Sequence, residues 1–218
     1  MRCTILRFYV PHYRTPADEE TAPAITLRDH YTRYKEECEK LLAEKTGSTE
    51  FAVIRPGVVY GPGSRYLGFL IGGIDRLWAF GIPFLGRGTS VAPLIYVKDL
   101  ARAVYRAGTE QDAAGQVFNL TDGLSETWAD FIHATASALG RKGRILPVPP
   151  PLLGVPSQLV DAVFSLFGVT PGLNAYVKYV TTDLLFGNGK AQQLLRWKPE
   201  FTRQQGIEEM VREYREKL

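Results

Sequence analysis

The chain has 218 residues with 26 basic and 23 acidic side chains, and 45% of its residues are apolar. This is typical of a globular protein that forms one large domain, or two small ones that share a core. The basic residues are scattered, which argues against a nucleic-acid-binding surface. Cys3 and Cys38 form no Cys-x-x-Cys pair, and His12, His30 and His133 show no ligand spacing. We therefore expect reduced thiols and no zinc site.

Strands and helices are predicted in alternation along the chain. Short apolar runs predict strands at 4–9, 51–55, 94–97 and 117–120, with a loop at 58–64. Helical periodicity predicts helices at 27–45, 66–80, 100–107, 125–140, 157–167 and 202–218. We expect Asp99 to cap the third helix, and Ser125 or Thr127 with Asp130 to form a capping box at the fourth. This alternation predicts an α/β fold with a parallel sheet.

The segment 145–168 is the most apolar part of the chain. Its prolines leave about 11 residues of helix, 157–167, whereas a bilayer-spanning helix needs ~20. We expect this segment to lie on a membrane surface or to cover an apolar pocket. The first ten residues are too short and polar for the apolar core of a signal peptide, so the expected location is the cytoplasm, with peripheral membrane contact left open.

Tyr31 and Lys35 are four residues apart in a predicted helix, so their side chains are expected to share a face. A free tyrosine has a pKa near ~10, and a neighbouring ammonium lowers it. Lowering the pKa by roughly 3 units takes roughly 4 kcal/mol. Such a tyrosine can take a proton from a hydroxyl or return one to a carbonyl. Chance supplies this pair in about half of chains of this composition, and an amphipathic surface helix is the alternative explanation.

Four further segments follow this pair in a fixed order. They read FAVIRPGVVYGPG, PLIYVKDLARAVYRA, GQVFNLTDGLSETWADF and KAQQLLRWKPEFTRQQGIEEMVREY. In order and spacing they resemble the extended short-chain dehydrogenase/reductase family, which includes the NAD-dependent epimerases and dehydratases. The resemblance covers the chain from about Asp18 to its C-terminus. It implies an enzyme fold. The order and spacing of these segments make the catalytic interpretation of Tyr31 and Lys35 stronger than the interpretation as a surface helix.

The resemblance implies roles for individual residues. Tyr31 would be the general base or acid, and Lys35 would lower its pKa and hold the nicotinamide ribose of NAD or NADP. Thr4 is the nearest candidate for the third catalytic position. The nicotinamide side of the pocket would be walled by Pro56, Gly57 and Val58. Asp99 is interpreted as structural, and Trp197 with Lys198 as part of a packing motif.

The resemblance also implies a division of the chain. The expected fold is the C-terminal part of a Rossmann-like parallel sheet plus a smaller, mostly helical substrate-binding domain. Residues 1–60 and 94–120 would be the remaining part of the NAD(P)-binding domain, and 61–93 with 121–218 the substrate-binding part. A homodimer is left open.

The substrate class has three alternatives. The apolar stretch at 145–168 is similar to the 3β-hydroxysteroid and sterol-4α-carboxylate 3-dehydrogenase branch, which implies oxidation of a sterol 3β-hydroxyl. A nucleotide sugar is the second alternative, with Arg65, Arg76 and Arg87 in the region that would hold its diphosphate. The third is a truncated, catalytically inactive remnant that acts as a binding module.

The chain departs from the family pattern at its start. No strand followed by a glycine-rich turn precedes Tyr31, although such a turn cradles the cofactor pyrophosphate in the family. Gly61-Pro62-Gly63 is rejected as this turn because Pro62 interrupts it and Tyr66 stands where the third glycine would be. We therefore expect weak NAD(P) binding by this chain alone.

Overall fold

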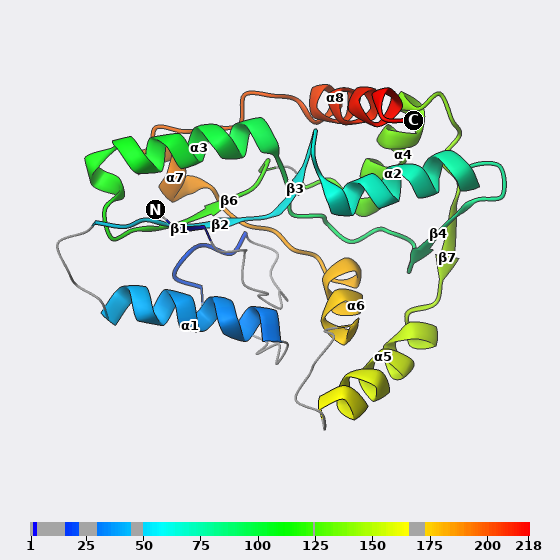
Figure 1. Ribbon diagram of the computed structural model, residues 1–218, viewed down its shortest axis with the longest axis horizontal. Coiled ribbons are helices and arrows are strands. Elements are labelled where there is room, and N and C mark those ends of the chain that lie inside the picture. The colour runs from blue at the N-terminus through cyan, green and yellow to red at the C-terminus, as the bar shows by residue number, and fades with distance from the viewer. Residues whose placement is uncertain (1, 4–15, 22–29, 45–49, 124, 166–172) are drawn as a thin grey trace.

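The computed structural model of the protein describes residues 2–3, 16–21, 30–44, 50–123, 125–165 and 173–218 (Figure 1). Its sheet contains β1 (Arg2–Cys3), β2 (Val53–Pro56) and β6 (Val117–Leu120) in the order β1-β2-β6. Both pairs of neighbours are parallel. The predicted α/β fold with parallel strands is therefore confirmed, while the strand predicted at 4–9 lies outside the described residues.

The chain changes its pairing partner at Gly57, directly after β2. Gly57 N still donates to Leu120 O of β6 (2.9 Å), whereas Val58 N donates to Pro93 O (2.7 Å). From there β3 (Val58–Tyr60) pairs in parallel with β5 (Leu94–Tyr96). The loop predicted at 58–64 was therefore wrong in its first half. A strand of three residues is too short to show an alternating pattern before the Gly-Pro-Gly turn.

A further parallel pair, which the sequence did not reveal, joins β4 (Ile82–Leu85) to β7 (Ile145–Val148). Each of these strands contains a proline, and proline normally argues against a strand because it cannot donate to the ladder. Here each strand has a single strand neighbour, so the missing donors are tolerated.

Eight α-helices lie in the described residues. Their bounds are α1 (His30–Glu44), α2 (Arg65–Leu77), α3 (Val97–Thr109), α4 (Trp128–Ala138), α5 (Pro150–Ser165), α6 (Leu173–Thr181), α7 (Gly189–Leu194) and α8 (Arg203–Glu216). The predicted capping box of α4 is confirmed with Thr127 as its N-cap: Thr127 Oγ1 accepts from Asp130 N, and Asp130 Oδ2 accepts from Thr127 N.

Two helix starts differ from the prediction. α3 begins at Val97, so Asp99 lies inside its first turn and does not cap it. α5 begins at Pro150, seven residues before the predicted start, because prolines are tolerated in the first turn, where the N–H groups have no helical partner. Pro156 lies inside this helix. None of the helices in the described part of the chain has the length and apolarity needed to cross a bilayer.

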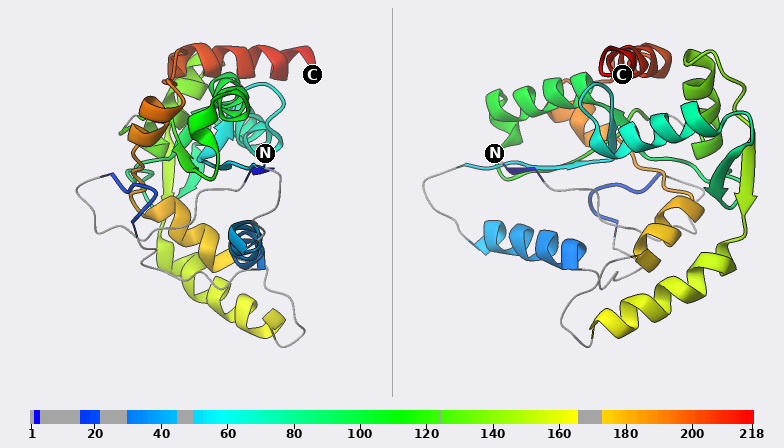
Figure 2. Two further views of the ribbon diagram at one scale, coloured as in Figure 1. Left: turned by 90° about the vertical axis from the view of Figure 1, so that its left-hand side faces the viewer. Right: turned by 45° about the vertical axis from the view of Figure 1, so that its right-hand side comes forward.

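The helices form layers on the two sides of the sheet (Figures 1 and 2). α3 and α7 cover one face, and a core containing Ile54, Phe118 and Trp197 fills the space between them and the strands. α1 lies on the opposite side of the sheet from α3. A larger apolar core joins α2, α4 and α8 to β3, β4 and β5. The sheet therefore separates the Tyr31 helix from the two larger apolar cores of the described residues.

Candidate active site

Tyr31 and Lys35 both lie on α1, one helical turn apart, as the spacing predicts. The side chain of Lys35 is half-buried, and its Nζ lies 5.6 Å from the centroid of the Tyr34 ring. Tyr34 itself is 59% exposed. The neighbouring tyrosine is thus a surface residue and a suitable control for Tyr31.

A buried ion pair connects α1 to the central strand β2. Arg55 Nε donates to Glu39 Oε1 (3.1 Å) and Arg55 Nη2 donates to Glu39 Oε2 (2.6 Å). The two side chains are 8% and 10% exposed. A bidentate arginine–carboxylate pair of this kind fixes geometry as well as adding energy. It therefore sets the register of the helix against the strand.

The direction of α1 places its first turns at the carboxyl end of β2. α1 runs antiparallel to β2, as Figure 1 shows. Lys35 lies about 6 Å before Glu39 along the helix axis, and Tyr31 lies about 6 Å before Lys35. Because Glu39 lies against Arg55 and the two elements are antiparallel, the helix positions before Glu39 lie beside the strand positions after Arg55, which are Pro56 and Gly57. Ligands of open α/β sheets bind at the carboxyl ends of the strands.

The backbone at this end of β2 forms a closed wall. Pro56 and Gly57 are buried, and the N–H groups of Gly57 and Val58 are both bonded inside the protein. A Cβ on Gly57 would lie 2.2 Å from Pro93 O, so this approach of the two strands requires glycine. Pro56, Gly57 and Val58 can contact a flat ring such as nicotinamide, but the N–H groups of Gly57 and Val58 are not free to donate to it.

A dinucleotide cofactor needs one site for its nicotinamide ribose and another for its pyrophosphate. Lys35 and the wall at Pro56 suit the nicotinamide ribose end of the cofactor. The turn at Gly61-Pro62-Gly63 does not suit the pyrophosphate, because Gly63 N donates to the carboxylate of Glu213 (2.6 Å). A carboxylate at that N–H would repel a phosphate. The residues described here therefore fit one end of the cofactor.

Other predicted site residues are not gathered with the pair. Thr4 lies outside the described residues. Arg65 and Arg76 lie at opposite ends of α2, eleven residues apart, which separates their backbones by about 16 Å. Arg76 and Arg87 are exposed. The arginines of α2 therefore do not form a single diphosphate clamp.

Asp99 is structural, but not as the predicted cap. Its fully buried carboxylate accepts from Glu200 N (3.0 Å), Phe201 N (3.2 Å) and Arg102 Nη1 (2.7 Å). Trp197 Nε1 donates to the Asp99 carbonyl (3.0 Å), and the indole is 2% exposed. The packing role expected of Trp197 is confirmed. Asp99 fastens the segment before α8 onto α3.

A second buried polar cluster was missed by the sequence analysis. Arg203 Nη1 donates to Glu126 Oε2 (2.5 Å), and its Nη2 lies 3.4 Å from Asp122 Oδ2. Burial and the Asp122 charge raise the pKa of Tyr60 above its usual range, so Tyr60 is not a base at neutral pH. Two carboxylates neutralise Arg203, which excludes this arginine as an anion site. These polar residues belong to separate segments that share no sequence motif, so only the tertiary structure shows that they form a cluster.

Glu39, Arg55 and Asn119 were also missed. Arg55 and Asn119 are register partners on β2 and β6 and stand among apolar neighbours. The amide of Asn119 is fully buried and has no hydrogen-bond partner in the part of the chain that the structure describes. The signal available in the sequence was a charged or amide side chain inside an apolar strand. Burying such a group costs free energy unless it is paired or hydrogen-bonded.

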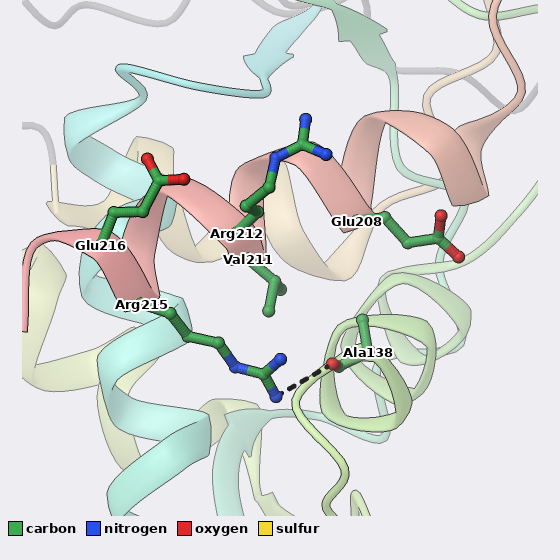
Figure 3. Close-up of a pocket in the computed structure, with 6 residues that line it drawn as sticks. All are labelled: Ala138, Glu208, Val211, Arg212, Arg215 and Glu216. Carbon is green, nitrogen blue, oxygen red and sulfur yellow. Dashed lines mark hydrogen bonds between the residues drawn. The ribbon is translucent and has the colours of Figure 1, made fainter.

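A surface hollow of about 460 Å³ lies elsewhere, between α4 and α8. It is lined by Ala138, Glu208, Val211, Arg212, Arg215 and Glu216 (Figure 3). Arg215 crosses it and donates to the Ala138 carbonyl (3.4 Å). α8 lies on the far side of the molecule from α1 (Figures 1 and 2), so this hollow is not part of the Tyr31 site.

The parallel strands with helices on both sides form a Rossmann-type α/β fold. The family model of the NAD dependent epimerase/dehydratase family matches residues 8–121, which is more than half of the chain. The chain belongs to this family.

Its relatives are consistent with that assignment. The chain is 29% identical to UDP-glucose 4-epimerase of Vibrio cholerae over 190 residues, which is 85% of this chain and 54% of the relative. It is 30% identical to Ceramide reductase of Caulobacter vibrioides over 153 residues, 67% of this chain and 42% of the relative. The chain thus spans about half the length of the curated relatives it matches.

Solved structures share the fold over nearly the whole chain. UDP-glucuronic acid 4-epimerase from Bacillus cereus, in complex with UDP-glucuronic acid and NAD, superposes with a TM-score of 0.72 at 18% identity, covering 99% of this chain and 61% of that one. UDP-glucose 4-epimerase from Thermotoga maritima, with UDP-glucose, gives 0.74 at 18% identity, covering 99% and 62%. The steroid branch expected from 145–168 gains no support from these relatives.

Proposed function

We propose that this chain supplies the proton-transfer and substrate-binding part of an NAD(P)-dependent epimerase or dehydratase that acts on a nucleotide sugar. One observation carries the proposal: the Arg55–Glu39 pair holds the Tyr31–Lys35 helix at the carboxyl end of β2, in a chain related to a UDP-glucose 4-epimerase. The sterol interpretation becomes secondary.

In the proposed mechanism, Tyr31 takes the proton from a sugar hydroxyl as the attached carbon is oxidised, and returns a proton in the reverse step. The ammonium of Lys35 stabilises the phenolate form of Tyr31. Bound NAD would supply the acceptor for the hydride. Matching the pKa of Tyr31 to neutral pH is what makes it an efficient base.

Lys35 would hold the nicotinamide ribose, and Pro56, Gly57 and Val58 would contact the ring. Residues 1–60 and 94–120 are proposed as the cofactor-binding part, and 61–93 with 121–218 as the substrate-binding part. The Glu213 carboxylate at Gly63 N favours weak cofactor binding by this chain. Calorimetric titration is expected to show no NAD or NADP binding in the micromolar range, and a micromolar affinity would refute this.

The substrate class is tested by the fluorescence of the three tryptophans. Trp128 is buried against Phe84 and Tyr179, at the junction of the β4–β7 pair with α6. UDP-glucose and UDP-glucuronic acid are expected to change the emission saturably, and a Trp128→Phe variant should lose most of the change. A response to a steroid with none to either UDP-sugar would contradict the proposal.

A replacement of Tyr31 distinguishes an enzyme from an inactive binding module. Tyr31→Phe should lower turnover by about 10²–10⁴-fold while leaving UDP-sugar affinity unchanged, because it removes the proton carrier alone. Tyr34→Phe, on the exposed neighbour, is the matched control and should keep full activity. If both variants behave like the parent chain in every assay, the binding-module alternative is correct.

Two observations favour a lipid substrate as a second candidate. The chain is 30% identical to a protein named Ceramide reductase, and α5 exposes Leu152, Leu159 and Val163 along a single helical stripe. The same fluorescence titration with a ceramide-like lipid tests this second candidate.

A further inference from the structure

Large apolar side chains are exposed along α2, in the turn that follows it and on β7. Phe69 on α2 is 84% exposed, and Phe80, three residues past the end of the helix, is 80% exposed. Leu77, Trp78 and Leu146 are exposed to a smaller extent. Exposed apolar residues that gather in this way mark a surface that binds a protein, a ligand or a membrane.

Four basic side chains stand among these residues. Arg76 belongs to the last turn of α2, and Arg141, Lys142 and Arg144 lie in the segment before β7. All four are exposed. Within the described part of the chain, Arg141 pairs with Asp75, whereas the other three form no ion pair. Three cations are therefore available to an anionic partner.

Contacts between the two segments make the apolar and basic residues one surface. The guanidinium carbon of Arg141 lies 5.2 Å from the centroid of the Trp78 ring, and Arg141 Nε donates to Asp75 Oδ1 (3.1 Å). Leu146 covers Gly81, where an added Cβ would lie 2.5 Å from Leu146 Cγ. Since α2 runs toward the β4–β7 pair (Figure 1), these exposed apolar and basic residues form a continuous basic–aromatic surface along the helix and onto β7.

We propose that the basic–aromatic surface attaches the chain peripherally to an anionic lipid bilayer. Phe69, Trp78 and Phe80 enter the interface between water and hydrocarbon, and the cations meet the headgroup phosphates. The sequence alone placed a membrane contact at 145–168, which shares Leu146 with this surface. The inference goes beyond the proposed function and does not depend on it.

The composition of the surface favours a bilayer over two other partners. Aromatic rings settle at the headgroup level of a membrane, and each basic residue near an anionic leaflet strengthens binding about fivefold. A second copy of this chain in a two-fold dimer would bring the same cations against one another, and like charges repel. A nucleic acid would stack its bases on aromatic rings, whereas Leu77 and Leu146 offer no ring.

The first test is co-sedimentation of the full chain with phosphatidylcholine vesicles, prepared with and without phosphatidylglycerol. Binding is expected with the anionic vesicles, and added salt should weaken it. Trp128 and Trp197 are buried, so a shift of the emission to shorter wavelength on binding reports Trp78. Trp78→Phe should lose this shift and still sediment with the vesicles.

Charge reversal tests the basic part of the surface. Lys142→Glu combined with Arg144→Glu should weaken binding to anionic vesicles by about tenfold or more. The matched control is Arg196→Glu combined with Lys198→Glu, two exposed residues that follow α7, away from the β4–β7 end of the molecule (Figure 1). It changes the net charge equally and should leave the affinity nearly unchanged.

A second pair of variants tests the apolar part. Phe80→Ser should weaken vesicle binding by about tenfold, because a phenyl ring no longer leaves water. Tyr105→Ser on α3 removes another exposed ring, which is 70% exposed, and should have little effect. All of these side chains are exposed, and circular dichroism checks that each variant folds.

Three results would overturn the proposal. The first is no sedimentation with anionic vesicles at low salt, or equal losses of binding in the surface variants and their controls. The second is binding of a single-stranded oligonucleotide without vesicle binding, lost in Lys142→Glu with Arg144→Glu, which identifies a nucleic-acid surface. The third is a dimer in analytical ultracentrifugation that dissociates in Phe80→Ser, which assigns the surface to a second copy. None of these results bears on Tyr31, whose role is measured by turnover.

Discussion

At the scale of single residues, Asp122 shows how burial sets a carboxylate's titration. It accepts from Tyr96 N (3.0 Å) and lies near Arg203, yet burial outweighs both and raises its pKa from 3.8 to about 6. The folded chain therefore binds this proton more tightly than the unfolded chain. Its contribution to stability is fully present below about pH 4 and is lost as the pH rises through about 6.

Replacing Asp122 with Asn should remove this pH dependence, because the amide can still accept from Tyr96 N but cannot titrate. Between pH 4 and pH 7, the parent chain should lose up to about 3 kcal/mol of unfolding free energy relative to Asp122→Asn. Urea denaturation at several pH values measures the difference. Asp112→Asn, on an exposed side chain, is the control for loss of a carboxylate, and parallel curves for the parent chain and Asp122→Asn would contradict the assignment.

Gly57 is the residue on which the change of strand partner depends. A methyl group there would meet Pro93 O at 2.2 Å, and this neighbour is backbone, which limits relaxation. Gly57→Ala should lower the unfolding free energy by about 3 kcal/mol. Gly73→Ala, inside α2 with open space at its Cβ, should instead stabilise the chain by up to about 1 kcal/mol. Urea midpoints that shift equally in the two variants would disprove the steric account.

At the scale of elements, Asp99 joins α3 to the segment that leads into α8. Three donors converge on a carboxylate that is fully buried, so its removal leaves two backbone N–H groups and one N–H group of Arg102 without their acceptor. This connection, and not a helix cap, explains why an acidic residue stands there.

Asp99→Ala is therefore expected to cost about 3–5 kcal/mol of stability and to speed amide exchange at Glu200 and Phe201. The matched control is Glu110→Ala at the end of the same helix, where the partner Arg106 is largely exposed, and its cost should stay below about 1 kcal/mol. Thermal unfolding and hydrogen exchange measure both effects. Equal losses in the two variants would show that the buried network contributes little.

At the scale of the whole molecule, β5 is a wall shared by two apolar cores. Ile95 belongs to the core under α3 and α7, whereas its neighbour Tyr96 belongs to the core of α2, α4 and α8. Adjacent residues of a strand point to opposite faces, so neither core can loosen without exposing the other.

The two cores should consequently unfold in a single transition. Phe118→Ala in one core and Ile132→Ala in the other should each cost about 2–5 kcal/mol and lower the same Tm. Calorimetry checks this through the agreement of the calorimetric and van't Hoff enthalpies. Two resolved transitions, each sensitive to one substitution, would show that the cores are independent.

Segments with a clear apolar pattern or their own caps were predictable from the sequence, whereas β3, β4 and β7 were not. The helices α4 and α8 and the strand β6 carry their own pattern and caps, so local residues specify them. β3, β4 and β7 have three or four residues each, and two of them contain proline. Their strand character comes from a neighbour that is distant in sequence, which no local pattern records.

The candidate site divides in the same way. The spacing of Tyr31 and Lys35, and the family resemblance, followed from the sequence because a helix turns the interval of four residues into proximity. Tertiary structure alone decided that Arg55 meets Glu39, that Glu213 occupies Gly63 N, and that the arginines of α2 stand apart. These contacts join separate elements, and the packing of the sheet with its helices sets their distances.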